Sequence, residues 1–234
     1  INKNKIKSYK LALACDPISA FGGIVSCNFK ITKKLADEIK NLFFEVVIGN
    51  GIEKNALKIL KKKKNLRIIN TKNFNLKDFQ SMIYNSNSLL IQSMDSKIFS
   101  KKNFKIVSKA KPDSKTLNSL IFAFNICRFA KSNAVVVAKD FTTIGIGSGQ
   151  TSRLDSCKIA IDKMNQFQII KDKDKIVAAS DAFFPFLDGV ETLVNAGVSA
   201  IIQPSGSIRD KEIIKYANQT GTVLIFSKTR HFRH

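Results

Sequence analysis

Short apolar runs rich in β-branched residues alternate along this chain with segments of helical periodicity. Apolar runs of this kind predict strands near 24–25, 44–48, 89–91, 134–138, 176–177, 200–202 and 222–226. Helical spacing predicts helices at about 32–41, 53–63, 114–131, 152–165, 188–196 and 209–220. The alternation favours an α/β fold, layered α/β/α, with a sheet covered on both faces.

The helix expected at 114–131 has the clearest pattern. Leu117, Leu120, Ile121 and Phe124 recur at helical spacing and would lie on one face. The preceding Pro112-Asp113-Ser114 supplies the residue types that start helices.

The stretch 70–115 is polar and rich in asparagine, and we place a soft boundary near its end. This predicts a first α/β subdomain over 1–115 and a second over 116–234, which carries most of the motifs described below. No internal repeat, proline-rich linker or low-complexity tract stands out from the general bias toward lysine and asparagine.

The composition of the 234 residues suits a substantial core, with 44% hydrophobic residues. Mean hydropathy is −0.05, and no apolar run approaches the roughly 20 residues of a membrane span. The basic N-terminus leads into neither a long apolar core nor a cleavage site, so it does not resemble a secretory signal. We expect a soluble cytoplasmic protein that does not bind membranes.

The net charge of +21 raises the question of a nucleic-acid partner. Lysines are spread over the whole chain, and the densest run, Lys61–Lys64, closes a predicted helix, where cations suit the dipole. Arginine, which makes bidentate phosphate and base contacts, is scarce beside lysine. Solvated charge is the expected explanation, and a basic RNA-binding α/β module remains an alternative.

The four cysteines, Cys15, Cys27, Cys127 and Cys157, form no C-x-x-C pair and are expected to be buried small hydrophobes. The histidines, His231 and His234, stand together at the C-terminus. This set offers no normal zinc spacing, so we expect no metal site.

Five segments combine turn glycines with polar residues at the ends of predicted strands, where ligand sites of α/β proteins gather. They are residues 16–25, 131–134, 145–153, 180–190 and 203–210. In the first, Gly22 and Gly23 would let the backbone approach a ligand, although an ordinary tight turn explains them equally well. In the second, the amide of Asn133 could both donate and accept, and the alternative is a helix C-cap.

The third segment reads as a strand, a glycine loop and a helix start, which is a generic anion site. Gln150 replaces the last glycine of the dinucleotide fingerprint, and the P-loop lysine is absent. Arg153 falls in the first helical turn, against the dipole preference, and therefore suggests an anionic ligand.

The fourth segment packs three phenylalanines around Pro185, between Asp181 and Asp188. Such a rigid apolar wall with polar ends suits a flat heterocycle such as a pterin. The alternative is a hydrophobic staple with Asp188 as the N-cap of the next helix. At the C-terminus a flexible tail would be usual, but the apolar strand just before Arg230 indicates that the end is held in place.

These segments together resemble a known family. The strings SAFGGIV, KSNA, IGIG, SDAFFPF, QPSGSIRD and RHFRH follow the order and spacing of the AICAR transformylase region of bifunctional purine biosynthesis enzymes. The similarity runs from about Asp16 to the C-terminus and is dense after Ala130. It implies a cytidine-deaminase-like fold duplicated into two subdomains, and a homodimer with sites at the subunit interface.

The resemblance also implies the chemistry, which is formyl transfer from the co-substrate 10-formyltetrahydrofolate to the 5-amino group of AICAR, without a metal. It assigns the nucleotide side to Gly22, Glu45, Asn133, Arg153 and Arg230. It assigns the folate side to Leu154, Phe183, Asp188, Ser207 and Ile208, some reaching across to the partner's site. Asn133 would hold the substrate near the reacting amine as a supporting catalytic residue.

One part of the family pattern has no counterpart in this sequence. The family's Lys-His pair, with the presumed general base, lies in a segment upstream of the SAFGG string, and nothing before Asp16 resembles it. The cyclohydrolase domain of the family has no counterpart either. We therefore expect a C-terminal piece of a longer protein that is inactive alone. A deaminase of related fold is a further alternative, although H-x-E and C-x-x-C are absent.

Overall fold

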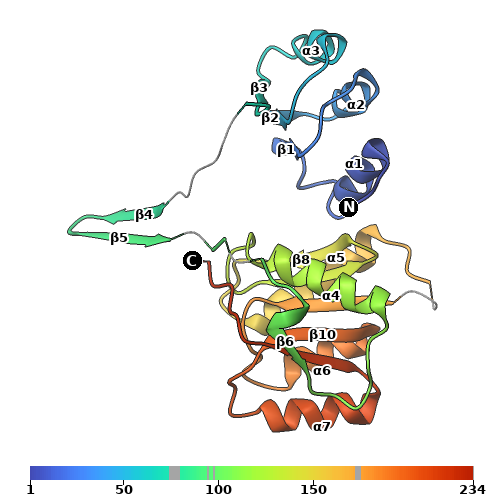
Figure 1. Ribbon diagram of the computed structural model, residues 1–234, viewed down its shortest axis with the longest axis vertical. Coiled ribbons are helices and arrows are strands. Elements are labelled where there is room, and N and C mark those ends of the chain that lie inside the picture. Colours follow the sequence, from blue (N-terminus) through green and yellow to red (C-terminus); the bar gives the residue numbers. More distant parts are fainter. Residues whose placement is uncertain (74–79, 94, 97, 172–174, 234) are drawn as a thin grey trace. The chain divides into compact units, whose positions relative to one another are not determined.

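The chain is divided into two compact units in a computed structural model that describes residues 1–73, 80–93, 95–96, 98–171 and 175–233. The N-terminal unit comprises Asn2–Leu13 and Pro17–Ser96, and the C-terminal unit comprises Ile1, Ala14–Asp16 and Lys97–His234 (Figure 1). The sequence suggested a boundary near 115. Strand β6 (Phe104–Ile106) already belongs to the C-terminal unit, because it pairs with a strand of that unit's sheet.

A six-stranded sheet in the order β6-β11-β10-β9-β7-β8 forms the centre of the C-terminal unit. Its other strands are β7 (Val135–Lys139), β8 (Thr142–Gly147), β9 (Ile176–Ser180), β10 (Val198–Pro204) and β11 (Val223–Ser227). β9, β10 and β11 run parallel, whereas β7 pairs antiparallel with both β8 and β9. The antiparallel hairpin β7–β8 therefore closes one side of a parallel sheet.

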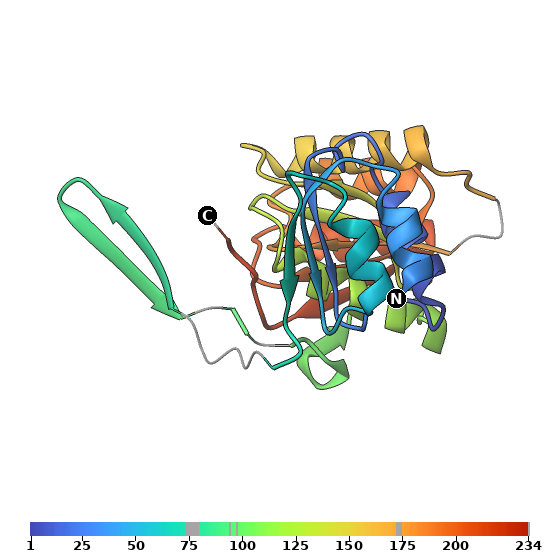
Figure 2. The same cartoon turned by 90° about the horizontal axis from the view of Figure 1, so that it is seen from above.

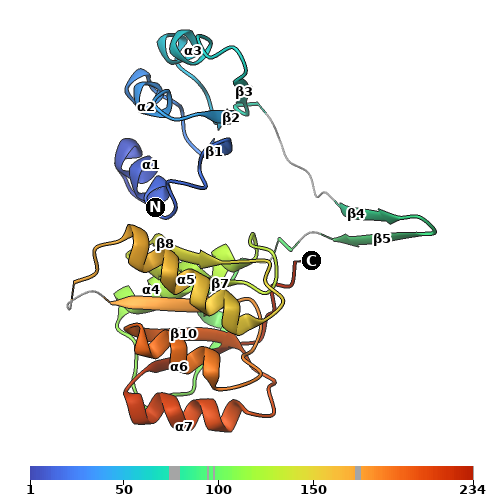
Figure 3. The same cartoon turned by 180° about the vertical axis from the view of Figure 1, so that it is seen from behind.

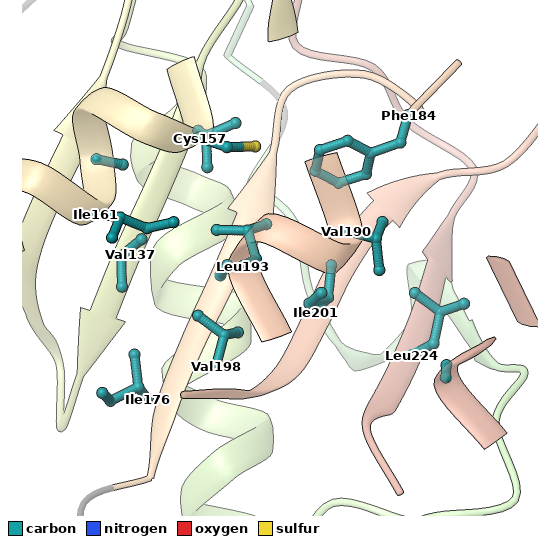
Figure 4. Close-up of a cluster of buried hydrophobic side chains, with 14 of the residues drawn as sticks. Val137, Cys157, Ile161, Ile176, Phe184, Val190, Leu193, Val198, Ile201 and Leu224 are labelled. Atoms are coloured by element: carbon teal, nitrogen blue, oxygen red, sulfur yellow. The ribbon is translucent and has the colours of Figure 1, made fainter. Parts of the chain in front are cut away.

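Helices cover both faces of this sheet. They are α4 (Ser114–Cys127), α5 (Arg153–Phe167), α6 (Asp188–Asn195) and α7 (Asp210–Thr220). Val136 and Ala138 of β7 pack in the α4 core, and Val135 and Val137 pack in the core beneath α5, α6 and α7. Figure 3 brings α5 and α6 to the front, and Figure 4 shows their buried side chains against the strands. The predicted layered α/β fold is confirmed.

Helix boundaries follow from local capping. Asp113, the N-cap of α4, accepts a hydrogen bond of 2.7 Å from the backbone N–H of Thr116. Ser152 caps α5 through a 3.0 Å bond from the backbone N–H of Asp155. α7 ends at Gly221, whose φ of 69° suits the left-handed C-cap position. None of the helices within the described ranges combines the length and apolar character needed to cross a bilayer.

Three parallel strands in the order β1-β2-β3 form the sheet of the N-terminal unit (Figure 2). They are β1 (Gly23–Cys27), β2 (Phe44–Gly49) and β3 (Arg67–Asn70), and the helices are α1 (Lys5–Leu13), α2 (Lys33–Ile39) and α3 (Lys54–Leu60). Apolar side chains of α2, α3 and β2 meet in one core, among them Leu35, Val47 and Leu60. β4 (Gln80–Asn85) and β5 (Ser88–Ser93) form a separate antiparallel ribbon.

The four cysteines are buried free thiols, as the sequence predicted. Burial raises the pKa of the Cys157 thiol to about 12 and holds the pKa of Cys127 well above its ordinary value. Both thiols are therefore protonated and unreactive near neutral pH.

Two glycines expected in a loop lie instead in strand β8, facing helix α5. A Cβ atom on Gly145 would lie 2.0 Å from the carbonyl oxygen of Ala160, and one on Gly147 would lie 1.9 Å from that of Ser156. The helix backbone therefore rests directly on the strand. In the turn that follows, Gly149 adopts a φ of 72°, a conformation that favours glycine. The role of Gly145 and Gly147 is close packing rather than an anion loop.

We predict that Gly147→Ala lowers the free energy of unfolding by about 3 kcal/mol or more, because the new methyl group overlaps helix backbone that cannot move aside locally. Gly197→Ala is the control: its φ of 89° favours glycine, unlike that of Gly147, but its Cβ would meet nothing within 4 Å. That substitution should cost only about 1–2 kcal/mol of backbone strain. Urea denaturation measures both, and equal losses would contradict the packing role.

Candidate functional site

A cavity of about 490 Å³ opens in the C-terminal unit, at the end of the sheet where β9 ends and β7 begins. The position fits the rule that ligands of α/β proteins bind at the carboxyl ends of parallel strands. Predicted site residues brought together in its lining are Asn133, Arg153, Leu154, Phe183, Asp188 and Arg230. The other lining residues are Thr151, Ser152, Ala182, Phe184, Pro185, Phe186 and Phe232.

A buried ion pair lies behind this cavity. Arg153 is 7% exposed and Asp181 is fully buried, and Nη1 of the arginine donates to Oδ1 of the aspartate. The same Nη1 contacts the Ser180 hydroxyl at 2.8 Å, and Nη2 donates to Oδ1 of Asn133 at 2.8 Å. Much of the guanidinium that was expected to grip an anion therefore binds the protein itself. Its charge is neutralised by Asp181, as a buried cation requires.

The side chain of Asn133 is held on both ends. Its Oδ1 accepts from Arg153, and its Nδ2 donates to the carbonyl oxygens of Gln150 at 3.0 Å and Thr151 at 3.2 Å. The amide thus ties the start of β7 to the loop before α5. The helix C-cap alternative is wrong, because α4 ends at Cys127 and its C-cap is Arg128.

The C-terminal segment is held against the same ion pair. Oδ2 of Asp181 accepts from the Ser132 hydroxyl at 2.5 Å, and the Ser132 backbone N–H donates to the Arg233 carbonyl at 2.9 Å. The His231 backbone N–H donates to the Asp181 carbonyl at 3.0 Å, and its ring packs 4.6 Å from that of Phe124. The prediction that the chain end is fixed is confirmed through Arg233, and His234 lies outside the described residues.

The three phenylalanines of the predicted wall divide between core and cavity. Phe184 is 1% exposed and belongs to the core, whereas Phe186 is 55% exposed. Phe183 is half-buried and lies 5.2 Å from the Arg230 guanidinium. Asp188 is the first residue of α6 rather than its N-cap, and its Oδ1 accepts from the Gly189 backbone N–H at 2.7 Å. An exposed aromatic edge and a carboxylate therefore border the cavity.

The remaining predicted residues do not line this cavity. Ser207 and Ile208 lie in the loop between β10 and α7, where Ile208 is fully exposed. Gly22 and Glu45 belong to the N-terminal unit. There, Glu45 lines a separate cavity of about 510 Å³ and pairs with Arg67 at 3.7 Å. Gly22 has a φ of 72°, which favours glycine.

The two arginines that line the cavity differ in whether they are free to bind an anion. Arg153 is neutralised internally, but none of the ion pairs among the described residues involves Arg230. Arg230 is therefore the cation best placed to meet an anion. Within the described ranges, no group of three or more His, Cys, Asp or Glu side chains could hold a metal ion.

Sequence reasoning treated Asp181 only as an acid that brackets the aromatic wall. The structure makes it the residue on which Arg153, Ser132 and the C-terminal segment converge. The only signal in the sequence was its place directly after the predicted strand at 176–177 and the small residues that follow it, which allows burial but does not require it. The identity of its partner was not visible in the sequence.

Comparison with known families shows the family to which the chain belongs. Residues 1–163 match the family model described as AICARFT/IMPCHase bienzyme. The chain belongs to this bienzyme family. The match includes Asn133, Arg153 and Leu154 of the cavity, and Gly22 and Glu45 of the N-terminal unit.

Individual members of the bienzyme family align with nearly the whole of this chain. A bifunctional purine biosynthesis protein PurH of Persephonella marina is 41% identical over 233 residues, covering 97% of this chain and 44% of the relative. The PurH of Buchnera aphidicola subsp. Schizaphis graminum is 45% identical over 239 residues, which cover 98% of this chain and 44% of the relative. The chain spans less than half the length of these relatives. A solved structure, protein ybgI of unknown function, aligns at 13% identity over 89% of this chain and 74% of that chain, but its TM-score of 0.22 carries no weight.

We predict that Asp181→Asn lowers the free energy of unfolding by about 3–5 kcal/mol, since it leaves the buried Arg153 cation without its counter-charge. Asp188→Asn is the matched control: it removes an exposed carboxylate and should cost less than about 1 kcal/mol. In an Arg153→Gln background, Asp181→Asn should cost far less than in the wild type. Chemical denaturation of the wild type, the Asp181→Asn and Arg153→Gln variants and the double variant completes this cycle, and additive losses would show that the pair is not coupled.

Proposed function

We propose that this chain carries the formyl-transferring part of the bienzyme. It would move the formyl group of 10-formyltetrahydrofolate to the 5-amino group of AICAR, a step of IMP biosynthesis. The observation that carries the proposal is the convergence of Asn133, Arg153, Phe183, Asp188 and Arg230 on one cavity, although these residues lie far apart in the sequence. The names of the relatives, purine biosynthesis proteins, support the same pathway.

The reaction forms one bond and breaks one. The amine nitrogen of AICAR attacks the formyl carbon, a C–N bond forms, and the bond between that carbon and N10 of the folate breaks. The amine would lose a proton to the family's Lys-His pair, which has no counterpart in this chain and would be supplied by the rest of the bienzyme, and N10 gains a proton. The amine is a weak nucleophile because its lone pair delocalises into the ring, so fixed geometry and proton removal should supply much of the rate.

The nucleotide end of the cavity is assigned to Arg230. Its guanidinium lies over the Phe183 ring and takes part in no ion pair among the described residues, so it can give charge-assisted hydrogen bonds to a phosphate. Arg153 would act indirectly: bound to Asp181, it fixes the orientation of the Asn133 amide beside the substrate. Asn133 therefore supports catalysis by holding position rather than by transferring a proton.

The folate end is assigned to the segment between β9 and α6. Phe183 and Phe186 offer aromatic surface for a flat ring, and Asp188 offers a carboxylate that can accept hydrogen bonds from ring N–H groups. Leu154, in the first turn of α5, adds an apolar side chain to the lining.

A homodimer with sites shared between subunits is part of the proposal. Ile208 is fully exposed on the loop after β10, where it would be free to contact a neighbouring subunit. Glu45 and Gly22 would serve the nucleotide from the N-terminal unit. No nucleic acid, membrane or metal is required by this assignment.

The first test is nucleotide binding. We predict that Arg230→Ala weakens AICAR binding by about 10- to 100-fold, the equivalent of roughly 1.5–3 kcal/mol for a charge-assisted contact. Lys62→Ala, which removes an exposed lysine, should change it little. Calorimetry at physiological salt measures both. Equal losses would indicate diffuse electrostatics, and a wild-type chain that binds neither AICAR nor a folate would overturn the proposed function.

The second test separates the ligand wall from the core. We predict that Phe183→Ala weakens binding of a folate analogue much more than binding of AICAR, which it would affect only through the lost contact with Arg230, with only a modest loss of stability, because this ring borders the cavity. Phe184→Ala is the control: its ring is 1% exposed, so its removal should cost about 3–5 kcal/mol of stability and affect both ligands alike. A Phe183→Ala variant that binds the folate analogue as tightly as the wild type would make the segment purely structural.

A further inference from the structure

Two arginines lie over phenylalanine rings beside the cavity. The Arg230 guanidinium is 5.2 Å from the centroid of the Phe183 ring. The Arg209 guanidinium is 5.4 Å from the centroid of the Phe186 ring. Both rings line the cavity. The proposed function uses Arg230 for the phosphate of the nucleotide, whereas Arg209 has no part in it, so a second cation next to the cavity has no role assigned.

The loop between β10 and α7 fixes the position of Arg209. The backbone N–H of Gly206 donates to Oδ2 of Asp210 at 2.8 Å, and the backbone N–H of Arg209 donates to the Ser207 hydroxyl at 3.2 Å. Gly206 has a φ of 118°, which favours glycine, and a Cβ there would lie 3.8 Å from Nη2 of Arg230. The loop therefore runs beside the cavity from Arg230 to Arg209.

The side chain of Arg209 is paired with a carboxylate at the surface. Its Nη1 lies 2.9 Å from Oε2 of Glu212, and the two side chains are 50% and 43% exposed. Exposed pairs three residues apart contribute little to stability, because water screens both charges. Arg153, in contrast, is buried against Asp181. Arg209 can therefore exchange Glu212 for the carboxylate of a ligand with little loss.

The two substrates of the proposed reaction each carry one anionic end. AICAR ends in a phosphate, and the folate ends in the carboxylates of its glutamate, on the side away from the pterin ring. The folate end of the cavity offers aromatic surface and the carboxylate of Asp188, and neither can neutralise a glutamate. Among the lining residues that the structure describes, the cations are Arg153, which is already neutralised, and Arg230. The glutamate therefore needs a cation from beyond the lining, and Arg209 lies over a ring of that end.

Arg209 and Phe186 together match this end of the folate. Phe186 is 55% exposed, so part of its ring surface is open to the benzoyl ring that precedes the glutamate. A guanidinium is planar and carries its N–H groups in a fixed fork, which suits a carboxylate through two parallel hydrogen bonds. Aromatic surface and positive charge thus lie next to each other, as the benzoyl ring and the glutamate do in the folate.

We propose that Arg209 binds the glutamate carboxylates of the folate, in place of its pairing with Glu212. This inference rests on the proposed function, because it requires a folate in the cavity. The benzoyl ring packs on Phe186, and the glutamate extends past that ring to the guanidinium. Arg209 is thus a residue that determines specificity for the charged end of the folate and takes no part in formyl transfer.

The experiment compares two probes by calorimetry: folic acid, and the methylamide of pteroic acid, which keeps the rings and lacks both glutamate carboxylates. The wild type should bind folic acid at least about tenfold more tightly than the methylamide. Arg209→Ala should reduce this ratio to less than about threefold by weakening folic acid alone, and should change AICAR affinity by less than about twofold. If the wild type binds neither probe, the proposed function fails and this assignment with it. If it binds both and Arg209→Ala leaves the ratio unchanged, the folate site stands and only the role of Arg209 is overturned.

Two further variants separate a specific contact from general attraction. Glu212→Gln removes the carboxylate that competes for Arg209, so it should tighten folic acid by about two- to fivefold and leave the methylamide unchanged. Lys211→Ala removes an exposed cation from the neighbouring position of α7 and should change the ratio by less than about twofold. Equal effects of Arg209→Ala and Lys211→Ala, or weaker binding of folic acid by Glu212→Gln, would overturn the proposal.

Discussion

The buried pair of Arg153 and Asp181 is the interaction on which the candidate site depends. Two opposite charges are removed from water, which is tolerable only because each finds its partner and further hydrogen bonds. The pair joins the start of α5 to the end of β9, and through Asn133 and Ser132 it reaches the start of β7. Segments that are distant in the chain are thereby held in one arrangement around the cavity.

The pair is placed by close packing elsewhere. α5 lies directly on β8 because Gly145 and Gly147 leave no side chain between the two backbones. This contact sets where the first turn of α5, and with it Arg153, meets the end of the sheet. The ion pair therefore depends on the close packing: Gly145 and Gly147 position α5, and α5 positions Arg153.

The large positive charge has little part in this site. Lysines dominate the surplus and are spread over both units, whereas the cavity sets one internally neutralised arginine, Arg153, beside Arg230 and Asp188. Selectivity for an anionic nucleotide would then depend on the placement of Arg230 rather than on total charge.

Much of the architecture was determined by the sequence alone. Apolar runs and helical spacing predicted most of the strands and every α-helix except α1, but they missed β3, β4, β6 and β8. Capping residues such as Asp113 marked helix starts, and the motif order identified the family. These signals are local in the chain. Only the tertiary structure decided that Asp181 compensates Arg153 and that Gly145 and Gly147 serve packing. Each of those facts depends on which distant segments meet, and that is set by the combined packing of whole elements, which no local pattern encodes.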